Sequence, residues 1–168
     1  MKKLKKRLLA VALTAAATAA MAMPSFAAAR NGEGDYYFRA YNGSGAYLNS
    51  WGNSVADGTP IRLYSYTGDS TQRWRVYKAS DGTYSLRSCA NTSLAINRDV
   101  DNKRAILWTW KNGRVDSDMT INRYGNTNDR YQFCLINGKE YLTAEASASG
   151  SHVCFKTFSG DAARWVRY

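Results

Sequence analysis

Three stretches decide the fold, because each repeats the same short pattern about 46 residues further along the chain. They read Ala46-Tyr47-Leu48-Asn49-Ser50, Thr92-Ser93-Leu94-Ala95-Ile96 and Glu140-Tyr141-Leu142-Thr143-Ala144. Aligned on their leucines, the stretches are separated by intervals of 46 and 48 residues. Self-similarity at a fixed period is typical of a fold built from repeated structural units.

Each copy continues with an apolar alternating strand and ends with another strand. The alternating strands are residues 61–66, 105–110 and 153–158, and the closing strands are residues 72–76, 118–121 and 163–166. This alignment gives Trp74, Thr120 and Trp165 the same position. Propellers typically need four or more blades. Three units of about four strands therefore predict an all-β fold, a β-trefoil of three repeats of about 46 residues.

Turn-forming dipeptides separate the strands. Asp57-Gly58, Asp81-Gly82, Asn112-Gly113 and Asn137-Gly138 accept the positive φ of tight hairpin turns. No stretch after residue 30 has sustained 3.6-residue apolar periodicity, so we expect almost no helix.

The first 27 residues have the layout of a signal peptide. Residues 1–7 carry four lysines and one arginine, and an apolar run of about sixteen residues follows. Small residues before the junction predict cleavage after Ala27, with Ala29 as the alternative. A membrane span needs about 20 apolar residues. We therefore expect a secreted protein without a stable membrane anchor.

The expected organisation is a removed signal peptide (1–27), a short lead-in (28–34) and one domain (35–168). After cleavage 18 basic and 13 acidic residues remain, a net charge of +5. The basic residues form no run, and export argues against nucleic acid as a partner.

Three cysteines follow the leader: Cys89, Cys134 and Cys154. An odd number allows at most one internal disulfide. A bond between Cys134 and Cys154, a bond between Cys89 and Cys134, and three buried thiols all remain open. The spacing fits no metal site, so we expect neither a metal nor a cofactor.

The ends of the repeats resemble a known family. Gln72-Arg73-Trp74 matches the Gln-x-Trp motif of the ricin-type (R-type) lectin domain, a β-trefoil, and Ala163-Arg164-Trp165 keeps its Trp. Asp118-Met119-Thr120 keeps neither residue. With the threefold period and the Asp57-Gly58-Thr59-Pro60 turn, the resemblance covers residues 35–168. It implies a monomeric carbohydrate-binding domain for a glycan or glycoprotein, acting alone or with another secreted protein.

The resemblance also implies where sugar would bind. The family's pocket combines an Asp after the leading Leu, an aromatic residue ending the third strand, and nearby polar groups. In repeat one these positions hold Asn49, Arg62, Tyr64, Thr71 and Gln72. An aromatic face packs against the C–H face of a sugar ring, while fixed donors and acceptors select its hydroxyl groups.

The other repeats match this pocket less well. In repeat two Trp108 holds the stacking position and Asp118 the Gln position, but Ala95 and Ile106 add no polar group. In repeat three Lys156 replaces the aromatic residue, so we expect no pocket there. Asn49, Ala95 and Thr143 replace the family's Asp, which argues against galactose-type specificity.

Alternation places two aromatic residues of repeat one in different environments. Tyr64 should point away from the core, opposite Ile61 and Leu63, whereas Trp74 should be buried. Trp51 and Trp110 lie beyond strand ends, where they would extend a binding surface or cover the barrel.

Two other classes of function compete with sugar binding. The only histidine, His152, accompanies no Ser or Cys nucleophile motif, and no pair of acids suggests a glycosidase, so we expect no enzyme. The alternative is a non-lectin β-trefoil that binds a protein, as in toxin receptor-binding subunits or protease inhibitors, because fold alone does not determine function.

Overall fold

A computed structural model describes residues 33–52, 55–125 and 129–168. Within these ranges the chain forms strands and one 3-10 turn, η1 (Gly160–Ala163), which confirms the all-β prediction. The strands are β1 (Gly34–Ala40), β2 (Tyr47–Ser50), β3 (Ile61–Tyr64), β4 (Arg73–Lys78), β5 (Tyr84–Ser88), β6 (Leu94–Arg98), β7 (Ala105–Thr109), β8 (Met119–Arg123), β9 (Arg130–Leu135), β10 (Tyr141–Ala144), β11 (Val153–Lys156) and β12 (Trp165–Arg167). The expected signal peptide and residues 28–32 of the lead-in lie outside the described residues.

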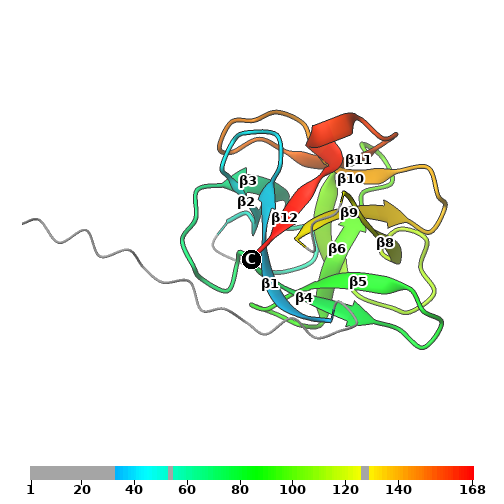
Figure 1. The fold of residues 1–168 in the computed structure, drawn as a ribbon. Coiled ribbons are helices and arrows are strands. Elements are labelled where there is room, and N and C mark those ends of the chain that lie inside the picture. Colours follow the sequence, from blue (N-terminus) through cyan, green and yellow to red (C-terminus); the bar gives the residue numbers. More distant parts are fainter. Residues whose placement is uncertain (1–32, 53–54, 126–128) are drawn as a thin grey trace, which may run out of the picture.

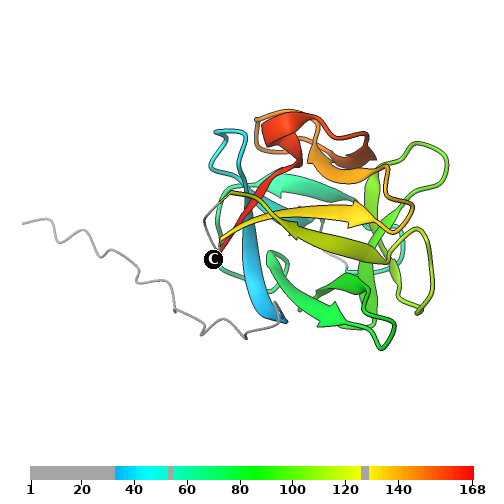
Figure 2. The ribbon, with the colours of Figure 1, turned by 45° about the vertical axis from the view of Figure 1, so that its right-hand side comes forward.

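Six strands close into a barrel in the order β1, β4, β5, β8, β9 and β12. Strand β12 closes the ring by pairing with β1, where Ala40 faces Trp165. The red β12 lies beside the blue β1 in both views (Figure 1 and Figure 2). The other six strands form the hairpins β2–β3, β6–β7 and β10–β11, and these three hairpins contact one another.

Strand pairing defines which residues of the three repeats are equivalent. The residues that pair with the first strand of their own repeat are Tyr47, Ala95 and Tyr141. The next residue of each strand is therefore equivalent too: Leu48, Ile96 and Leu142. Our prediction that Leu94 corresponds to Leu48 is wrong. Leu94 lies two residues earlier on the same buried face as Ile96.

The closing strands need a second correction. Trp74 pairs with Ser88, Met119 with Leu135, and Trp165 with Ala40, each partner being at the end of the next repeat's first strand. Met119, and not Thr120, is therefore the counterpart of the two tryptophans. Its side chain is fully buried, whereas Thr120 is exposed.

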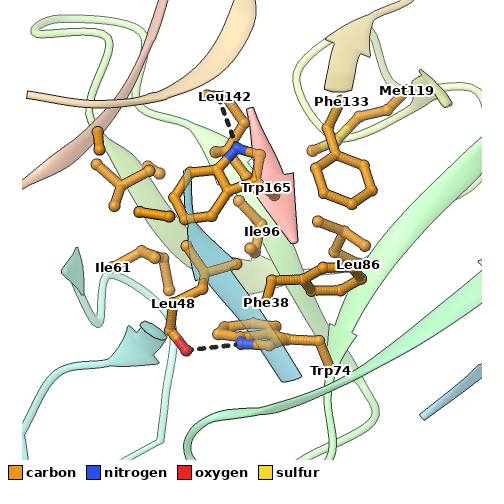
Figure 3. Packing of buried hydrophobic residues seen from close by; sticks show 14 of the residues in the cluster. Phe38, Leu48, Ile61, Trp74, Leu86, Ile96, Met119, Phe133, Leu142 and Trp165 are labelled. Atoms are coloured by element: carbon orange, nitrogen blue, oxygen red, sulfur yellow. Dashed lines mark hydrogen bonds between the residues drawn. The ribbon is translucent and has the colours of Figure 1, made fainter. Parts of the chain in front are cut away.

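The core contains the residues that the repeat pattern predicts. Trp74 and Trp165 are both 0% exposed, and Figure 3 shows them among Phe38, Phe133 and Ile96. Each indole nitrogen donates to the carbonyl oxygen of a core leucine in its own repeat, Trp74 to Leu48 at 2.9 Å and Trp165 to Leu142 at 3.0 Å (Figure 3). The two tryptophans thus connect the β2–β3 and β10–β11 hairpins to the barrel as well as filling its interior.

The three cysteines are free thiols. Cys134 on β9 and Cys154 on β11 are buried, and β10 lies between them because it pairs with both strands. A disulfide requires Cα atoms within about 7 Å, so this arrangement does not favour a bond between them. Cys89 is half-buried at the end of β5.

No helix in the part of the chain that the structure describes is long and apolar enough to cross a membrane.

Candidate functional site

A pocket of about 590 Å³, which we call pocket 1, opens between the β2–β3 hairpin and the loop that leads into β4. Its described lining residues are Asn49, Ser50, Trp51, Gly52, Tyr64, Thr67, Asp69 and Thr71. Three of the residues predicted from the sequence, Asn49, Tyr64 and Thr71, are among them.

Tyr64 supplies an exposed aromatic face. Strand alternation buries Ile61 and Leu63 completely and leaves Tyr64 39% exposed, as predicted. Trp51, directly after β2, packs edge-on to the Tyr64 ring with centroids 5.4 Å apart and planes at 76°. The two rings form a corner on one side of the pocket.

The lining of pocket 1 also includes a hydrogen-bonded polar cluster. The Thr71 hydroxyl lies 3.2 Å from Asn49 Oδ1 and is also hydrogen-bonded to Asp69 Oδ1. Asp69 Oδ2 accepts a 2.8 Å hydrogen bond from the Thr67 hydroxyl. Hydrogen bonds from Thr71 and Thr67 hold the pKa of Asp69 below its usual value, so the carboxylate stays ionised at neutral pH.

Gln72 positions the loop and is not among the residues that line pocket 1. Its side chain is 0% exposed, donates to Ser65 O at 2.7 Å and accepts from Thr67 N at 2.8 Å. These two bonds span the loop from residue 65 to residue 72. Gln72 therefore fixes Thr67 and Asp69 beside the pocket.

Arg62 contacts Trp51, one of the residues that line pocket 1. Its guanidinium carbon lies 5.1 Å from the centre of the Trp51 ring, and its Nε is buried without a hydrogen-bond partner. Strand β3 pairs Arg62 with Asn49. We conclude that Arg62 orients Trp51 and does not itself line pocket 1.

A second pocket of about 330 Å³, pocket 2, occupies the corresponding place in repeat two. Its described lining residues are Asn97, Arg98, Asp99, Val100, Ile106, Trp108, Arg114 and Asp116. By strand register Asn97 is equivalent to Asn49, and Trp108 to Tyr64. Trp108 is 42% exposed, so it presents an aromatic face as predicted.

Pocket 2 is more polar than the sequence alignment indicates. The position assigned to Ala95 holds Asn97, because the register of β6 differs by two residues from the leucine alignment. Asp116 corresponds to Thr71 and forms a 3.0 Å ion pair with Arg98. The prediction that this position of repeat two, assigned to Ala95, supplies no polar group is therefore wrong.

Asp118 does not occupy the Gln position. Since Met119 is the counterpart of Trp74, Ser117 is the counterpart of Gln72. Asp118 is 1% exposed, and its Oδ2 has no hydrogen-bond partner. Burial raises the pKa of its carboxyl group. The carboxylates among the described residues that line pocket 2 belong to Asp99 and Asp116.

Repeat three places a cation where the other repeats have an aromatic ring. Lys156 is equivalent to Tyr64 by strand register, and its Nζ pairs with Glu145 Oε1 at 3.2 Å. Thr143 and Ala163 occupy the remaining family positions. No stacking face is present at this place in the repeat.

Sequence reasoning missed the acidic and hydroxyl groups of the loop before β4, Asp69 and Thr67. It also missed Asn97 and Asp116 in repeat two. Aligning Ile96-Asn97 with Leu48-Asn49, instead of matching the two leucines, would have identified Asn97 and moved the repeat into register.

Comparisons with known proteins agree with this geometry. The model of the family described as ricin-type beta-trefoil lectin domain-like matches residues 25–108. No curated protein matches the chain by sequence. Among solved structures, the designed threefold-symmetric protein ThreeFoil is 22% identical, with a TM-score of 0.69 over 79% of this chain and 96% of that chain.

Two natural proteins have similar folds. The Rhizoctonia solani agglutinin is 17% identical, with a TM-score of 0.67 over 80% of this chain and 94% of its own. The Macrolepiota procera ricin B-like lectin, solved with lactose, is 16% identical, with a TM-score of 0.62 over 80% and 94% of the two chains. At these identities the likeness shows the β-trefoil fold alone. The family match over half of the chain, together with that fold, shows that this chain belongs to the ricin-type beta-trefoil lectin domain-like family.

Proposed function

We propose that this chain is an exported carbohydrate-binding protein that holds a sugar in pocket 1. The observation that carries the proposal is that the exposed ring of Tyr64 lines one pocket together with hydrogen-bonded polar groups. A sugar ring would lay its C–H face on Tyr64, while Asn49 and Thr71 meet its hydroxyl groups. Family membership supports the same class of ligand.

Pocket 2 is the second candidate site for sugar. Trp108 supplies its stacking face, and Asn97 and Asp116 supply polar groups at the positions of Asn49 and Thr71. The charged residues of pocket 2 differ from the residues of pocket 1, so the two pockets should differ in ligand preference.

Binding without catalysis is the activity that these pockets favour. Among the described residues, no three His, Cys, Asp or Glu side chains cluster as a metal site would require. The single histidine, His152, lies in a bridge with Arg62 on the backbone of β3. Burial and the nearby Arg62 and Arg104 lower the pKa of His152.

Export rests on the residues before the domain. The basic start and short apolar run of residues 1–27 support a cleaved leader and a secreted protein. N-terminal sequencing of protein from the culture medium should give a start at Ala28 or Arg30. Intact chain in a membrane fraction would contradict export by cleavage.

A glycan array probed with wild-type protein and two tyrosine variants tests the function. Tyr64→Ala should lose the wild-type signal, because it removes the stacking face of pocket 1. Tyr77→Ala is the matched control, since Tyr77 is 38% exposed and is not among the residues that line either pocket. Signal loss should be specific to Tyr64→Ala.

Other array results would count against the proposal. A blank array with folded protein would favour the protein-binding alternative. Signal retained by Tyr64→Ala but lost in Trp108→Ala would move the site to pocket 2.

A further inference from the structure

Asp69 is the only charged residue among the described residues that line pocket 1. The other lining residues contribute rings, hydroxyl groups, an amide and backbone. The ionised Asp69 carboxylate places a negative charge in the lining of pocket 1, whereas the nearby Arg62 guanidinium lies over the Trp51 ring and is not among the described lining residues. A ligand group of positive charge is therefore favoured at this place.

The Asp69 carboxylate is held in one orientation with capacity left for a ligand. Oδ1 accepts from Thr71 N at 3.0 Å and from the Thr71 hydroxyl, while Oδ2 accepts from the Thr67 hydroxyl at 2.8 Å. The backbone N–H of Gln72 also helps to lower the pKa of this carboxyl group. A carboxylate offers about four acceptor sites. Oδ2 receives fewer of the hydrogen bonds at 3.5 Å or less than Oδ1 does, so Oδ2 is the oxygen that can accept from a donor in the pocket.

The aromatic corner also favours a cation. Aromatic faces attract ammonium groups within about 6 Å of the ring centre. The Arg62 guanidinium already lies 5.1 Å from the centre of the Trp51 ring, whereas the Tyr64 side chain is 39% exposed and so accessible to a ligand. A sugar with an ammonium substituent could stack on the Tyr64 ring and donate a hydrogen bond from its ammonium group to the Asp69 carboxylate.

Pocket 2 provides an internal comparison. The turn before β4 has a backbone bond from Gln72 N to Asp69 O, and the turn before β8 has the same bond from Ser117 N to Arg114 O. Arg114 is therefore the counterpart of Asp69, with the opposite charge, and it lines pocket 2. Two pockets on one scaffold thus differ in charge at one equivalent position.

We infer that pocket 1 selects a sugar carrying a protonated amine, and that Asp69 is the residue that selects it. The sugar ring lies on Tyr64 and the ammonium donates to Asp69 Oδ2. This inference rests on the proposed function, since it assumes that pocket 1 binds sugar.

The test compares methyl glycosides of the gluco and galacto series that carry hydroxyl, acetamido or free amino groups at C2. Calorimetry with the purified protein at pH 6, where the sugar amine is protonated, should show the amine bound about fivefold more tightly than its hydroxyl counterpart. Fivefold corresponds to about 1 kcal/mol, the upper range for solvent-accessible charge pairs. In Asp69→Asn the ratio of the two affinities should fall to about one.

Asp81→Asn is the matched control for the loss of one negative charge. Asp81 accepts hydrogen bonds from Thr83 N at 2.9 Å and from the Thr83 hydroxyl at 2.6 Å, the same local pattern as Asp69 with Thr71. It is not among the residues that line pocket 1. The amine preference should therefore survive in Asp81→Asn.

A measurement on the wild-type protein does not depend on how any variant folds. Raising the pH neutralises the sugar amine and leaves Asp69 ionised, so the amino glycoside should no longer bind more tightly than its hydroxyl counterpart. At pH 6, added salt should reduce the preference for the amino glycoside.

The other possible results of these binding experiments contradict either the amine preference alone or sugar binding as well. Equal affinity for amino and hydroxyl glycosides, or a preference that persists in Asp69→Asn, overturns the inference, while sugar binding that requires Tyr64 leaves the proposed function standing. Absence of binding to every glycoside overturns both.

Discussion

The indole nitrogen of Trp74 donates a 2.9 Å hydrogen bond to the carbonyl oxygen of Leu48, the residue directly before Asn49. Trp74 belongs to a barrel strand and Leu48 to the hairpin that carries one side of pocket 1. One side chain therefore fills the core and holds the hairpin in place.

This relationship separates scaffold from site in repeat one. Trp74→Ala should lower the free energy of unfolding by about 3–5 kcal/mol, because a fully buried indole leaves a large cavity. Tyr64→Ala should change it by less than about 1 kcal/mol, since that ring is partly exposed. Urea unfolding of both variants measures the difference. Equal losses would mean that Tyr64 also belongs to the core.

Replacing Gln72 should damage the loop of pocket 1. Gln72→Ala leaves Thr67 N and Ser65 O without their partner, so we expect a loss of about 1–3 kcal/mol in unfolding free energy. Affinity for a pocket 1 ligand should fall with it, because Thr67 and Asp69 lose their support. Hydrogen exchange of the Thr67 amide reports the loop directly, and unchanged protection there would refute this role.

Asp118 should make the protein less stable as the pH rises. Burial raises the pKa of its carboxyl group in the folded state, so the folded protein binds this proton more tightly than the unfolded chain does. Its stabilising contribution is complete below the unfolded pKa of about 3.9 and is lost as the pH rises through the folded value.

Asp118→Asn removes the titratable carboxyl group and with it the pH dependence that Asp118 contributes to stability. Thermal unfolding at pH 4 and pH 7 should show the variant gaining stability relative to wild type at the higher pH. Ser117→Ala removes the hydroxyl that lies 3.5 Å from Asp118 Oδ1 and lowers the pKa of Asp118, so this variant should instead lose more stability than wild type as the pH rises. An equal difference between Asp118→Asn and wild type at both pH values would argue against a raised pKa.

Thiol titration distinguishes the cysteine arrangements that the sequence leaves open. In the folded protein at pH 8, Cys134 and Cys154 should react slowly with a disulfide reagent, because both thiols are buried and burial raises the pKa of Cys154 to about 11. Unfolding in guanidinium without reductant should expose all three thiols to a disulfide reagent. One reactive thiol after unfolding would instead reveal a disulfide.

The β-trefoil was predictable because its barrel repeats a pattern of large buried residues. Trp74 and Trp165 stand at equivalent places, and glycine dipeptides mark the turns between strands. The register of repeat two was harder to predict. Leu94 and Ile96 are two residues apart and share one buried face, so strand alternation, with its period of two, fits either alignment.

The second error in repeat two has a different cause. The spacing that aligns Thr120 with Trp74 and Trp165 also matches Asp118 to the Gln position, although a shift of one residue turns a side chain to the other face of a strand. Met119 is buried and Thr120 exposed, and alternation along β8 would have placed them correctly. Asp69 lies in an irregular loop, where no periodic signal indicates which side chains face a pocket.

Closure of the barrel by β12 and β1 has a consequence for how the protein is made. Residues 38–40 are synthesised well before residues 165–167, with which they pair in the barrel. Until then β1 and β9 each present an unpaired edge, the kind of surface on which chains associate wrongly. Residues 165–167 must therefore be synthesised before the β1 and β9 edges of the barrel are covered.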